Sequence, residues 1–424
     1  MAPRTLGTAR SFLILLVVLV AGACSSRSDS GPTPTPGPLP ASLQQIMNDV
    51  STIRELSPPP TLNVQSVSRS QVPALVKRLL TDDDHRWFAR TTTLYRLLGH
   101  LRKDQDYESV YLNFSGSDVL GLYSPVGHEL WVVHDDGSNF DFDHLASQEM
   151  QTLAHEMVHA LQDYHFNLDA IDRSVTNDLD TDLTATCVIE GDAVTYAGIY
   201  ADRFLAAPIA SRLTLVSLPA ASDAPASLTR EFYFPYQDGA AWVEGVQAKH
   251  GAAGVDALLQ QIPHGTAYVL HPERLDAGWQ PASVSLPDLS ASLGNGWARE
   301  SGGTFGEFEL RNYLQLHIPG GNAATVAAGW DGDHYDVYVN GSQSVAAFRL
   351  HFADTAGANS FLAAQATFLA GAQGKATRQG AITYTQTADG NVTATTAAVG
   401  SDVMFVIGSS QAAAQRAMEA LVHG

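Results

Sequence analysis

The chain has little cysteine, little positive charge and no long hydrophobic run after Val20. Its 424 residues include only 2 Cys, too few for a disulfide framework, so the fold must rest on its hydrophobic core. Lys and Arg number 24 against 44 Asp and Glu, which gives a formal net charge of −20. This balance argues against a nucleic-acid or anionic-membrane surface and fits a protein that works outside the cytoplasm. The hydrophobic fraction of 45% and the length predict a globular chain with two domains.

Residues 1–24 have the pattern of an export signal. Arg4 and Arg10 supply positive charge, residues 12–20 form an uninterrupted apolar run, and small residues precede Cys24. The run is far shorter than the roughly 20 residues needed to span a bilayer. Small residues before a cysteine resemble a bacterial lipobox, although the usual Leu three places before the cysteine is Ala here. We therefore expect lipidation of Cys24, with ordinary secretion as the alternative.

Residues 25–40 are rich in Pro, Ser and Thr and form a predicted tether. A tether at this end is useful if Cys24 anchors the chain, so we expect an exported lipoprotein of the cell membrane that faces outward. The second cysteine, Cys187, stands between apolar and Thr neighbours and is expected to be a small buried residue.

The chain after the tether has the periodicity of a mixed α+β protein. Helices are expected at 42–54, 70–80 and 82–101, and residues 119–123 and 129–134 form a predicted hairpin. A hairpin before the motif described next is either an edge strand that binds an extended substrate or an ordinary sheet strand.

The pattern His-Glu-x-x-His occurs at residues 155–159, inside a predicted helix of about residues 147–163. Residues four apart lie on one face of a helix, so His155 and His159 can bind one metal ion, with Glu156 beside it. The helix has apolar residues on all of its faces, which predicts that it is buried. Two buried imidazoles and a carboxyl need partners, and zinc is the ion that this pattern indicates.

A catalytic zinc needs a third protein ligand, and two candidates compete. His165 reproduces the spacing of metzincins, but Gln162 stands where that family has the Gly that turns the helix. A continuing helix would carry His165 away from His159. Glu190 lies in an apolar stretch that predicts a second helix, where a carboxyl needs a reason. We favour Glu190, with Gln162 as an outer contact and Asp192 or Asp182 as a carboxylate that steadies a ligand.

The segments His155–Leu168 and Val188–Ala193 resemble a group of bacterial, largely uncharacterised lipoprotein zincins of the gluzincin type. The likeness extends to Phe234–Gly239 and to Leu270–Glu273 and covers roughly residues 45–280. It implies a zincin-like fold, one catalytic zinc ion and peptidase chemistry, but no particular substrate.

In that chemistry Glu156 would act as general base on a water activated by the metal. The developing oxyanion needs a further donor, for which His271, Tyr236 and Tyr233 are candidates because they follow in the same domain.

The remaining segments carry no cluster of metal ligands. The Asp-rich connection over 167–181 is expected to be exposed, and residues 205–228 are expected to form a loop or flap. Residues 281–303 lack periodicity and mark a boundary between a catalytic domain at 41–285 and a C-terminal domain at 300–424. The latter combines strands expected at 335–339, 344–352, 381–386, 392–397 and 403–407 with helices at 305–316, 354–369 and 411–422.

The sequence thus predicts an α+β fold: a zincin-like metallopeptidase domain followed by a smaller antiparallel α+β domain. The expected function is zinc-dependent hydrolysis of peptide bonds in a peptide or protein substrate outside the cytoplasm, with no nucleic-acid partner. Two alternatives remain. One is a binding lipoprotein that keeps a zincin fold without catalysis, and the other is a zinc hydrolase of a non-peptide amide.

Overall fold

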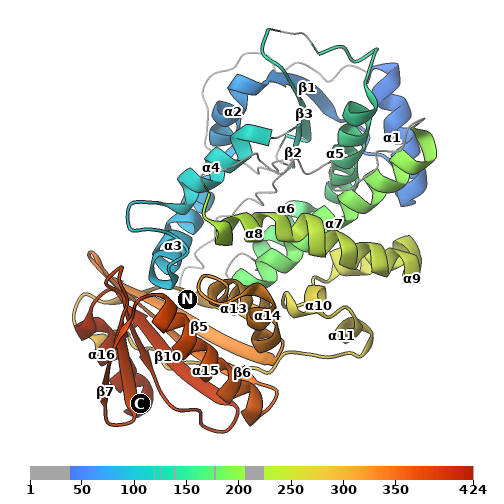
Figure 1. Cartoon of the computed structure of the whole chain (residues 1–424). Helices are drawn as coiled ribbons and strands as arrows, with labels where there is room; N and C mark the ends of the chain where they lie inside the picture. Colours follow the sequence, from blue (N-terminus) through green and yellow to red (C-terminus); the bar gives the residue numbers. More distant parts are fainter. Residues whose placement is uncertain are drawn as a thin grey trace, which may run out of the picture.

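The computed structural model describes residues 39–118, 120–125, 127–137, 140–175, 178–205 and 224–423. The predicted signal with Cys24, nearly all of the tether and most of the predicted 205–228 loop lie outside these residues. Helices and two sheets together make up the described chain (Figure 1), which confirms the α+β class.

The N-terminal unit, residues 41–276, is mostly helical and contains a three-stranded sheet. Its elements are α1 (Ala41–Arg54), β1 (Asn63–Ser68), η1 (Arg69–Gln71), α2 (Val72–Leu79), α3 (Asp82–Leu98), α4 (Tyr107–Asp118), β2 (Gly121–Ser124), β3 (Glu129–His134), α5 (Ser147–Phe166), α6 (Leu168–Val175), α7 (Leu179–Phe204), α8 (Ala226–Phe234), the π-helix η3 (Pro235–Gly239), α9 (Ala240–Gln260), α10 (Ala267–Leu270) and α11 (Glu273–Asp276). The strand order is β1-β3-β2. β1 is parallel to β3, and β2 pairs antiparallel with β3 as the predicted hairpin.

Helices α5 and α7 form the centre of this unit. Every residue of α5 from 151 to 163 is buried, and α7 is buried along most of its length. The first turn of α5 is closed by Glu149, which accepts a 2.6 Å hydrogen bond from the backbone N–H of Ala146. Asp178 caps α7 by accepting from the N–H of Thr181 at 2.9 Å. The two helices pack against each other, and α1 and α9 cover them.

The Asp-rich connection differs from the expectation of an exposed segment. Residues 168–175 form α6, which buries an apolar face through Leu168, Ile171 and Val175. The pattern of one apolar residue every three or four positions outweighs the acidic composition here.

The C-terminal unit, residues 290–423, is built on a seven-stranded antiparallel sheet. Its elements are α12 (Ser290–Leu293), β4 (Ala298–Gly303), α13 (Gly306–Leu314), α14 (Gly320–Ala327), β5 (Trp330–Asn340), β6 (Gln343–Phe352), α15 (Thr355–Gly371), β7 (Lys375–Gln379), β8 (Ile382–Gln386), β9 (Val392–Thr395), β10 (Asp402–Gly408) and α16 (Gln411–His423). The strand order is β4-β5-β6-β10-β9-β8-β7, and all neighbours are antiparallel. α12 and α16 cover one face, and α13, α14 and α15 pack on the other side.

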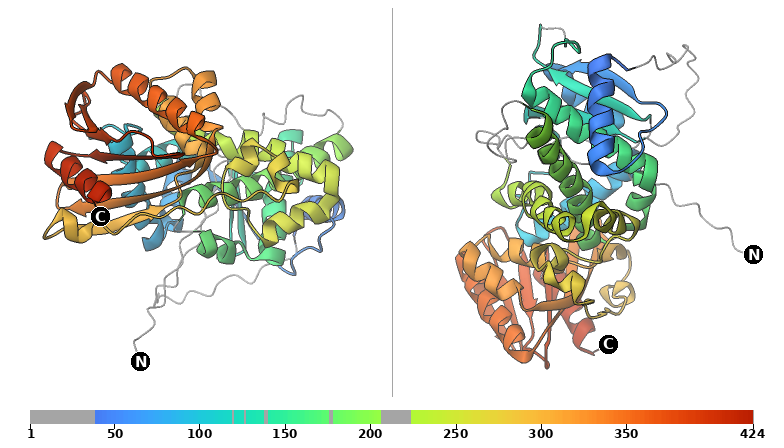
Figure 2. Two further views of the ribbon diagram at one scale, coloured as in Figure 1. Left: turned by 90° about the horizontal axis from the view of Figure 1, so that it is seen from below. Right: turned by 90° about the vertical axis from the view of Figure 1, so that its right-hand side faces the viewer.

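The two units share a core. Helix α3 of the N-terminal unit packs on β6 and β10 of the large sheet, and one continuous apolar cluster joins Phe88 and Leu94 of α3 to Phe348 and Phe405 of the sheet. The two sheets lie at opposite ends of the molecule (Figure 2), with α3, α7, α8 and α13 between them. The C-terminal unit also contacts α7, one of the two helices that carry the site described below, through α13.

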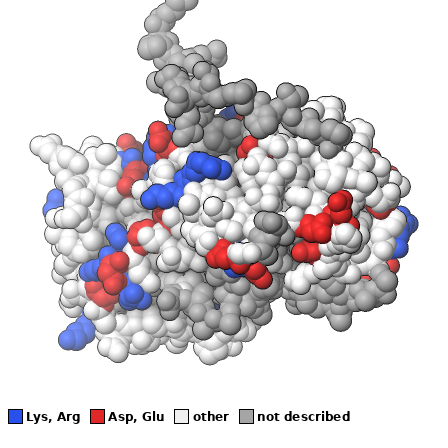
Figure 3. All heavy atoms as spheres, turned by 90° about the horizontal axis from the view of Figure 1, so that it is seen from above, with Lys and Arg blue, Asp and Glu red and all other residues white. Residues whose placement is uncertain are grey.

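Within the described chain, no helix has both the length and the apolar character that crossing a bilayer would require. On the face seen in Figure 3, acidic and basic side chains gather in small separate patches.

Candidate metal centre

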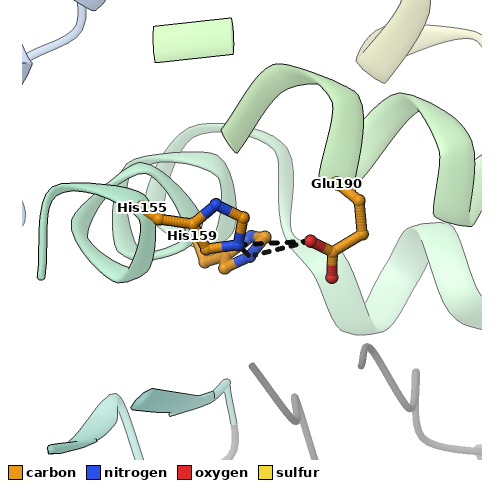
Figure 4. Close-up of side chains that lie close together, drawn as sticks. All are labelled: His155, His159 and Glu190. Atoms are coloured by element: carbon orange, nitrogen blue, oxygen red, sulfur yellow. Dashed lines mark hydrogen bonds and ion pairs between the residues drawn. The ribbon is translucent and has the colours of Figure 1, made fainter. Parts of the chain in front are cut away.

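Three buried side chains from α5 and α7 converge on one point. His155 and His159 project from the same face of α5, and Glu190 reaches them from the middle of α7 (Figure 4). The Nε2 atoms of the two imidazoles are 3.2 Å apart, and Glu190 Oε2 lies 3.2 Å from His155 Nε2 and 3.7 Å from His159 Nε2. All three residues are at most 1% exposed. Among the described residues, these three side chains form the one group of at least three His, Cys, Asp or Glu residues whose ligand atoms lie close enough together to hold a metal ion.

The spacing and the donor chemistry both fit a tetrahedral ion. Nitrogen and oxygen ligands bind zinc at about 2.0–2.1 Å, so that two of them in a tetrahedral site are ~3.3 Å apart. The three measured separations bracket that value. Moreover, Nδ1 of His155 has no hydrogen-bond partner, and the carboxylate of Glu190 makes no hydrogen bond beyond its contacts with the two imidazoles, although these atoms are buried. Buried groups of this kind are costly unless something pairs with them, and a cation between them would satisfy the carboxylate.

The orientation of His159 is set by Gln162, one turn later on α5. The Gln162 amide nitrogen donates to Ile189 O at 2.9 Å and to Asp192 Oδ2 at 2.8 Å. Because both partners accept only, the amide oxygen must face His159 Nδ1, 2.8 Å away. Nδ1 therefore carries the proton, and Nε2 keeps a lone pair for a metal. The expected outer contact of Gln162 and the proposed role of Asp192 as a steadying carboxylate agree with this geometry.

A buried arginine completes this chain of contacts. Arg54 at the end of α1 is fully buried, and its Nε lies 2.9 Å from Asp192 Oδ1 while Nη2 lies 2.7 Å from Asp256 Oδ1. Burial opposes the charged guanidinium, but the two aspartates outweigh it and raise the pKa of Arg54. The charge of Asp192 is thus balanced, and His159 is linked to α1 and α9 through hydrogen bonds and ion pairs.

Glu156 lies on the side of α5 that faces β2. Its carboxyl is fully buried, and neither oxygen has a hydrogen-bond partner. A Cβ atom placed on Gly121 of β2 would come within 2.7 Å of Glu156 Oε1, so the glycine lets this side chain lie directly against the strand. β2 is the last strand of its sheet, but its four residues are buried, and both interpretations of the hairpin stay open.

The pKa values of the two carboxyls move in opposite directions. Burial raises the pKa of Glu156 well above its usual range, and the charge of Glu190 adds to the effect. Burial would also raise the pKa of Glu190, but His159 and His155 outweigh it and lower that pKa. Burial lowers the pKa of His155, which favours the neutral imidazole that metals bind. A divalent cation at the point of convergence would stabilise both carboxylates in their charged form.

Tyr236 lies beside this cluster, in the π-helix η3. Burial raises the pKa of its phenol well above the usual range, and the charge of Glu190 raises it further, so that the hydroxyl stays a donor. η3 approaches α7 closely: a Cβ on Gly191 would lie 2.6 Å from Gly239 O, and one on Gly239 would lie 2.9 Å from Cβ of Cys187. Cys187 is fully buried, as expected. Two glycines thus allow the backbone that carries Tyr236 to press against the helix that carries Glu190.

Other predicted site residues lie elsewhere. His271 pairs with Glu307 of α13, Nε2 to Oε1 at 2.7 Å, and is not a member of the metal cluster. His165 is exposed and bonds through Nε2 to Ser57 O at 2.8 Å. Tyr233 is buried with its ring against Phe114. Of the predicted residues, the structure therefore brings together His155, His159 and Glu190, with Glu156 and Tyr236 close to Glu190.

Arg54, Asp256 and Gly121 belong to this site and were not found by sequence reasoning. Arg54 is far from the motif in the sequence, and at the end of an amphipathic helix it resembles an ordinary surface residue. A glycine in a strand often marks a place where another group comes close to the backbone. Gly121 therefore suggests such a contact, but only the structure shows that the group is Glu156.

Comparison with known proteins bears on the C-terminal unit. A family model described as a domain of unknown function (DUF8575) matches residues 296–418, from β4 into α16. No curated protein and no solved structure matches the chain. The metal cluster lies outside the matched residues.

Proposed function

We propose that this protein is a zinc-dependent peptidase with a zincin-like N-terminal unit. His155, His159 and Glu190 would hold the zinc ion. One observation carries the proposal: two imidazoles and a carboxylate from two buried helices converge at the separations of a tetrahedral site. A second carboxyl, Glu156, stands next to them without a partner.

A zinc ion at this site would polarise a substrate carbonyl and acidify a water molecule. The Glu156 carboxylate would serve as the base that takes a proton from the attacking water and passes it to the leaving amine. The Tyr236 hydroxyl, held in its protonated form beside Glu190, would donate a hydrogen bond to negative charge on the substrate carbonyl oxygen. Gln162 holds His159 in the tautomer that leaves Nε2 free. Export and anchoring through a lipidated Cys24 belong to the same proposal and would place the activity outside the cell membrane.

Substitution of Glu156 tests the proposal. Glu156→Gln keeps the size of the side chain and removes the base, so peptide cleavage should fall by about 10²–10⁴-fold while one zinc per chain is retained. The measurement is cleavage of a mixed-sequence peptide library, followed by mass spectrometry, together with metal analysis. Glu149→Gln on the same helix is the matched control, because glutamine preserves the capping position and Glu149 is outside the cluster.

The outcomes separate the alternatives. Zinc without any cleavage that depends on Glu156 would contradict the peptidase and favour a binding lipoprotein. Cleavage of small amides but not of peptides would favour a hydrolase of another amide.

A further inference from the structure

A second buried cluster lies next to the metal centre along α7. Leu179, Asp182, Leu183 and Thr186 are spaced at helical intervals and line one side of a cavity, and Glu190 follows one turn after Thr186 on the same face. Tyr236 lines the same cavity. The cavity therefore ends within about one helical turn of the metal cluster, which is a rise of ~6 Å along the axis.

The cavity has an aromatic wall and an acidic floor. Its aromatic lining residues are Trp87, Phe88, Tyr107, Tyr111, Phe232 and Tyr236. Its floor is formed by Glu231 of α8 and Glu309 of α13, which are 6% and 1% exposed. At the rim, Trp87, Leu183 and Thr186 are half-buried. The volume is about 70 Å³, against ~10–15 Å³ for one water molecule, which suits the end of a side chain.

Hydrogen bonds satisfy the two carboxyl groups of the floor only in part. Glu231 accepts hydrogen bonds from Tyr107 and Tyr95, at 2.8 and 2.9 Å. Glu309 Oε1 accepts from Tyr95 at 3.2 Å, but Glu309 Oε2 has no hydrogen-bond partner.

No lysine or arginine in the described chain lies within ion-pair distance of either glutamate. The imidazole of His100 is 3.9 Å from Glu309 Oε2, and burial lowers the pKa of His100 to about 3, so it is neutral. The positive charge of Arg230 interacts electrostatically with Glu309. However, the Arg230 guanidinium donates its hydrogen bond to Asn312 Oδ1, at 2.9 Å.

Aromatic rings around carboxylates are the surroundings that favour an organic cation, because the ring faces and the acidic groups both attract positive charge in a desolvated site. We propose that this cavity is a specificity pocket for a basic side chain, lysine or arginine, of the peptide substrate. The inference rests on the proposed function, since it places the cleaved bond at the metal cluster beside the pocket.

The C-terminal unit acquires a role through this pocket. Glu309 belongs to α13, within the residues that the family model matches, whereas Glu231 and the rim belong to the N-terminal unit. The C-terminal unit thus completes the pocket by supplying the carboxylate oxygen that has no partner.

The first test compares matched peptides that carry lysine, arginine, norleucine or glutamine at each position around the cleaved bond. Zinc-loaded protein should prefer a basic residue at one position. Glu231→Gln and Glu309→Gln should each reduce the ratio of kcat/KM for basic over neutral peptides by about 10–100-fold, as expected for loss of a charged hydrogen bond. Glu307→Gln, which removes a buried carboxyl from the same helix outside the cavity, is the control and should leave the ratio unchanged.

The second test needs no catalysis. Binding of n-butylguanidine and n-butylamine to the full chain is measured by ligand-observed NMR, with n-butanol as the neutral probe. The two cations should bind and n-butanol should not, and Glu309→Gln should weaken binding by about 10-fold or more. Thr186→Phe at the half-buried rim should block the cations even if a glutamate variant fails to fold.

The two tests fail independently. If no peptide is cleaved but the cations bind in a Glu309-dependent way, the peptidase proposal fails and the cation pocket stands. If peptides are cleaved without preference for a basic residue, or with a preference that survives both glutamine substitutions, the pocket inference is overturned. Equal binding of n-butanol and the cations would also overturn it.

Discussion

Two buried acidic clusters lie along one face of α7, and their partners differ. At Glu190 the partners are two imidazoles from α5, and the pKa of the carboxyl falls despite complete burial. At Glu231 and Glu309 the partners are tyrosine hydroxyls, and burial raises the pKa of Glu231 to about 7 and that of Glu309 well above its usual range. Neutral hydroxyl donors do not offset the loss of water, whereas imidazoles that can carry charge do.

The difference indicates which ligand each cluster fits. The first cluster presents nitrogen lone pairs and a carboxylate at the spacing of a metal site. The second presents carboxylates and ring faces without a nitrogen ligand, so it favours a larger organic cation over a metal ion. Three experiments test whether the two clusters differ in this way.

The largest effect is expected for Glu190→Ala. The substitution removes one of the three proposed ligands, so the zinc content after dialysis should fall from about one ion per chain to nearly none. Metal analysis of the purified variants measures it. His165→Ala is the matched control and should keep its zinc. The reverse result, zinc retained in Glu190→Ala and lost in His165→Ala, would identify His165 as the third ligand.

A smaller effect, on stability, is expected at the second cluster. Glu231 has a folded pKa of about 7 against 4.5 for the free side chain, so the folded state holds the proton longer than the unfolded state. The contribution of Glu231 to the free energy of unfolding should therefore fall by about 3 kcal/mol as the pH rises from 4.5 to 7. Glu231→Gln should lose much of this slope.

Urea unfolding between pH 4 and 8 measures that slope. Glu419→Gln, which changes an exposed glutamate on α16, should follow the wild type. An unchanged slope in Glu231→Gln would show that its proton does not set the difference between the clusters.

The smallest of the three effects is expected for Gln162→Leu. The leucine leaves Nδ1 of His159 without an acceptor, and the zinc affinity should fall by about 10–100-fold. Competition with a chelating dye measures the affinity. Gln148→Leu on the exposed part of the same helix is the control. If Gln162→Leu binds zinc as tightly as the wild type, the tautomer of His159 is fixed by the metal alone.

The metal cluster could be anticipated because its residues obey local rules. The spacing of His155 and His159 places them on one helix face, and Glu190 was conspicuous as a carboxyl in an apolar helix. Gln162 is one turn from His159, so its contact also follows from spacing. The second cluster had no such signal, because Glu231 and Glu309 lie on helices of different units and meet through tertiary packing alone. His271 was chosen for its position in the chain, and its contact with Glu307 depends on the same packing.

The fold follows a similar division. In the C-terminal unit the structure has strands or helices at each range predicted from periodicity. The strands that prediction missed, β4 and β7, are the two edges of the large sheet, and the five residues of β7 are all exposed. An edge strand that faces water has no need of an apolar alternation, so periodicity cannot detect it. The packing of α3 on the large sheet could not be predicted either, because an apolar helix face does not identify the element that packs on it.

The close contact between Gly191 and Gly239 has a consequence for how related chains can vary. The Tyr236 hydroxyl can lie close to Glu190 because neither Gly191 nor Gly239 has a side chain between η3 and α7. A single substitution at either position would push η3 away from α7 and move the Tyr236 hydroxyl away from the Glu190 carboxylate. In homologues that have the proposed activity, these two positions should therefore vary as little as the proposed ligands themselves, whereas homologues without it should tolerate alanine there.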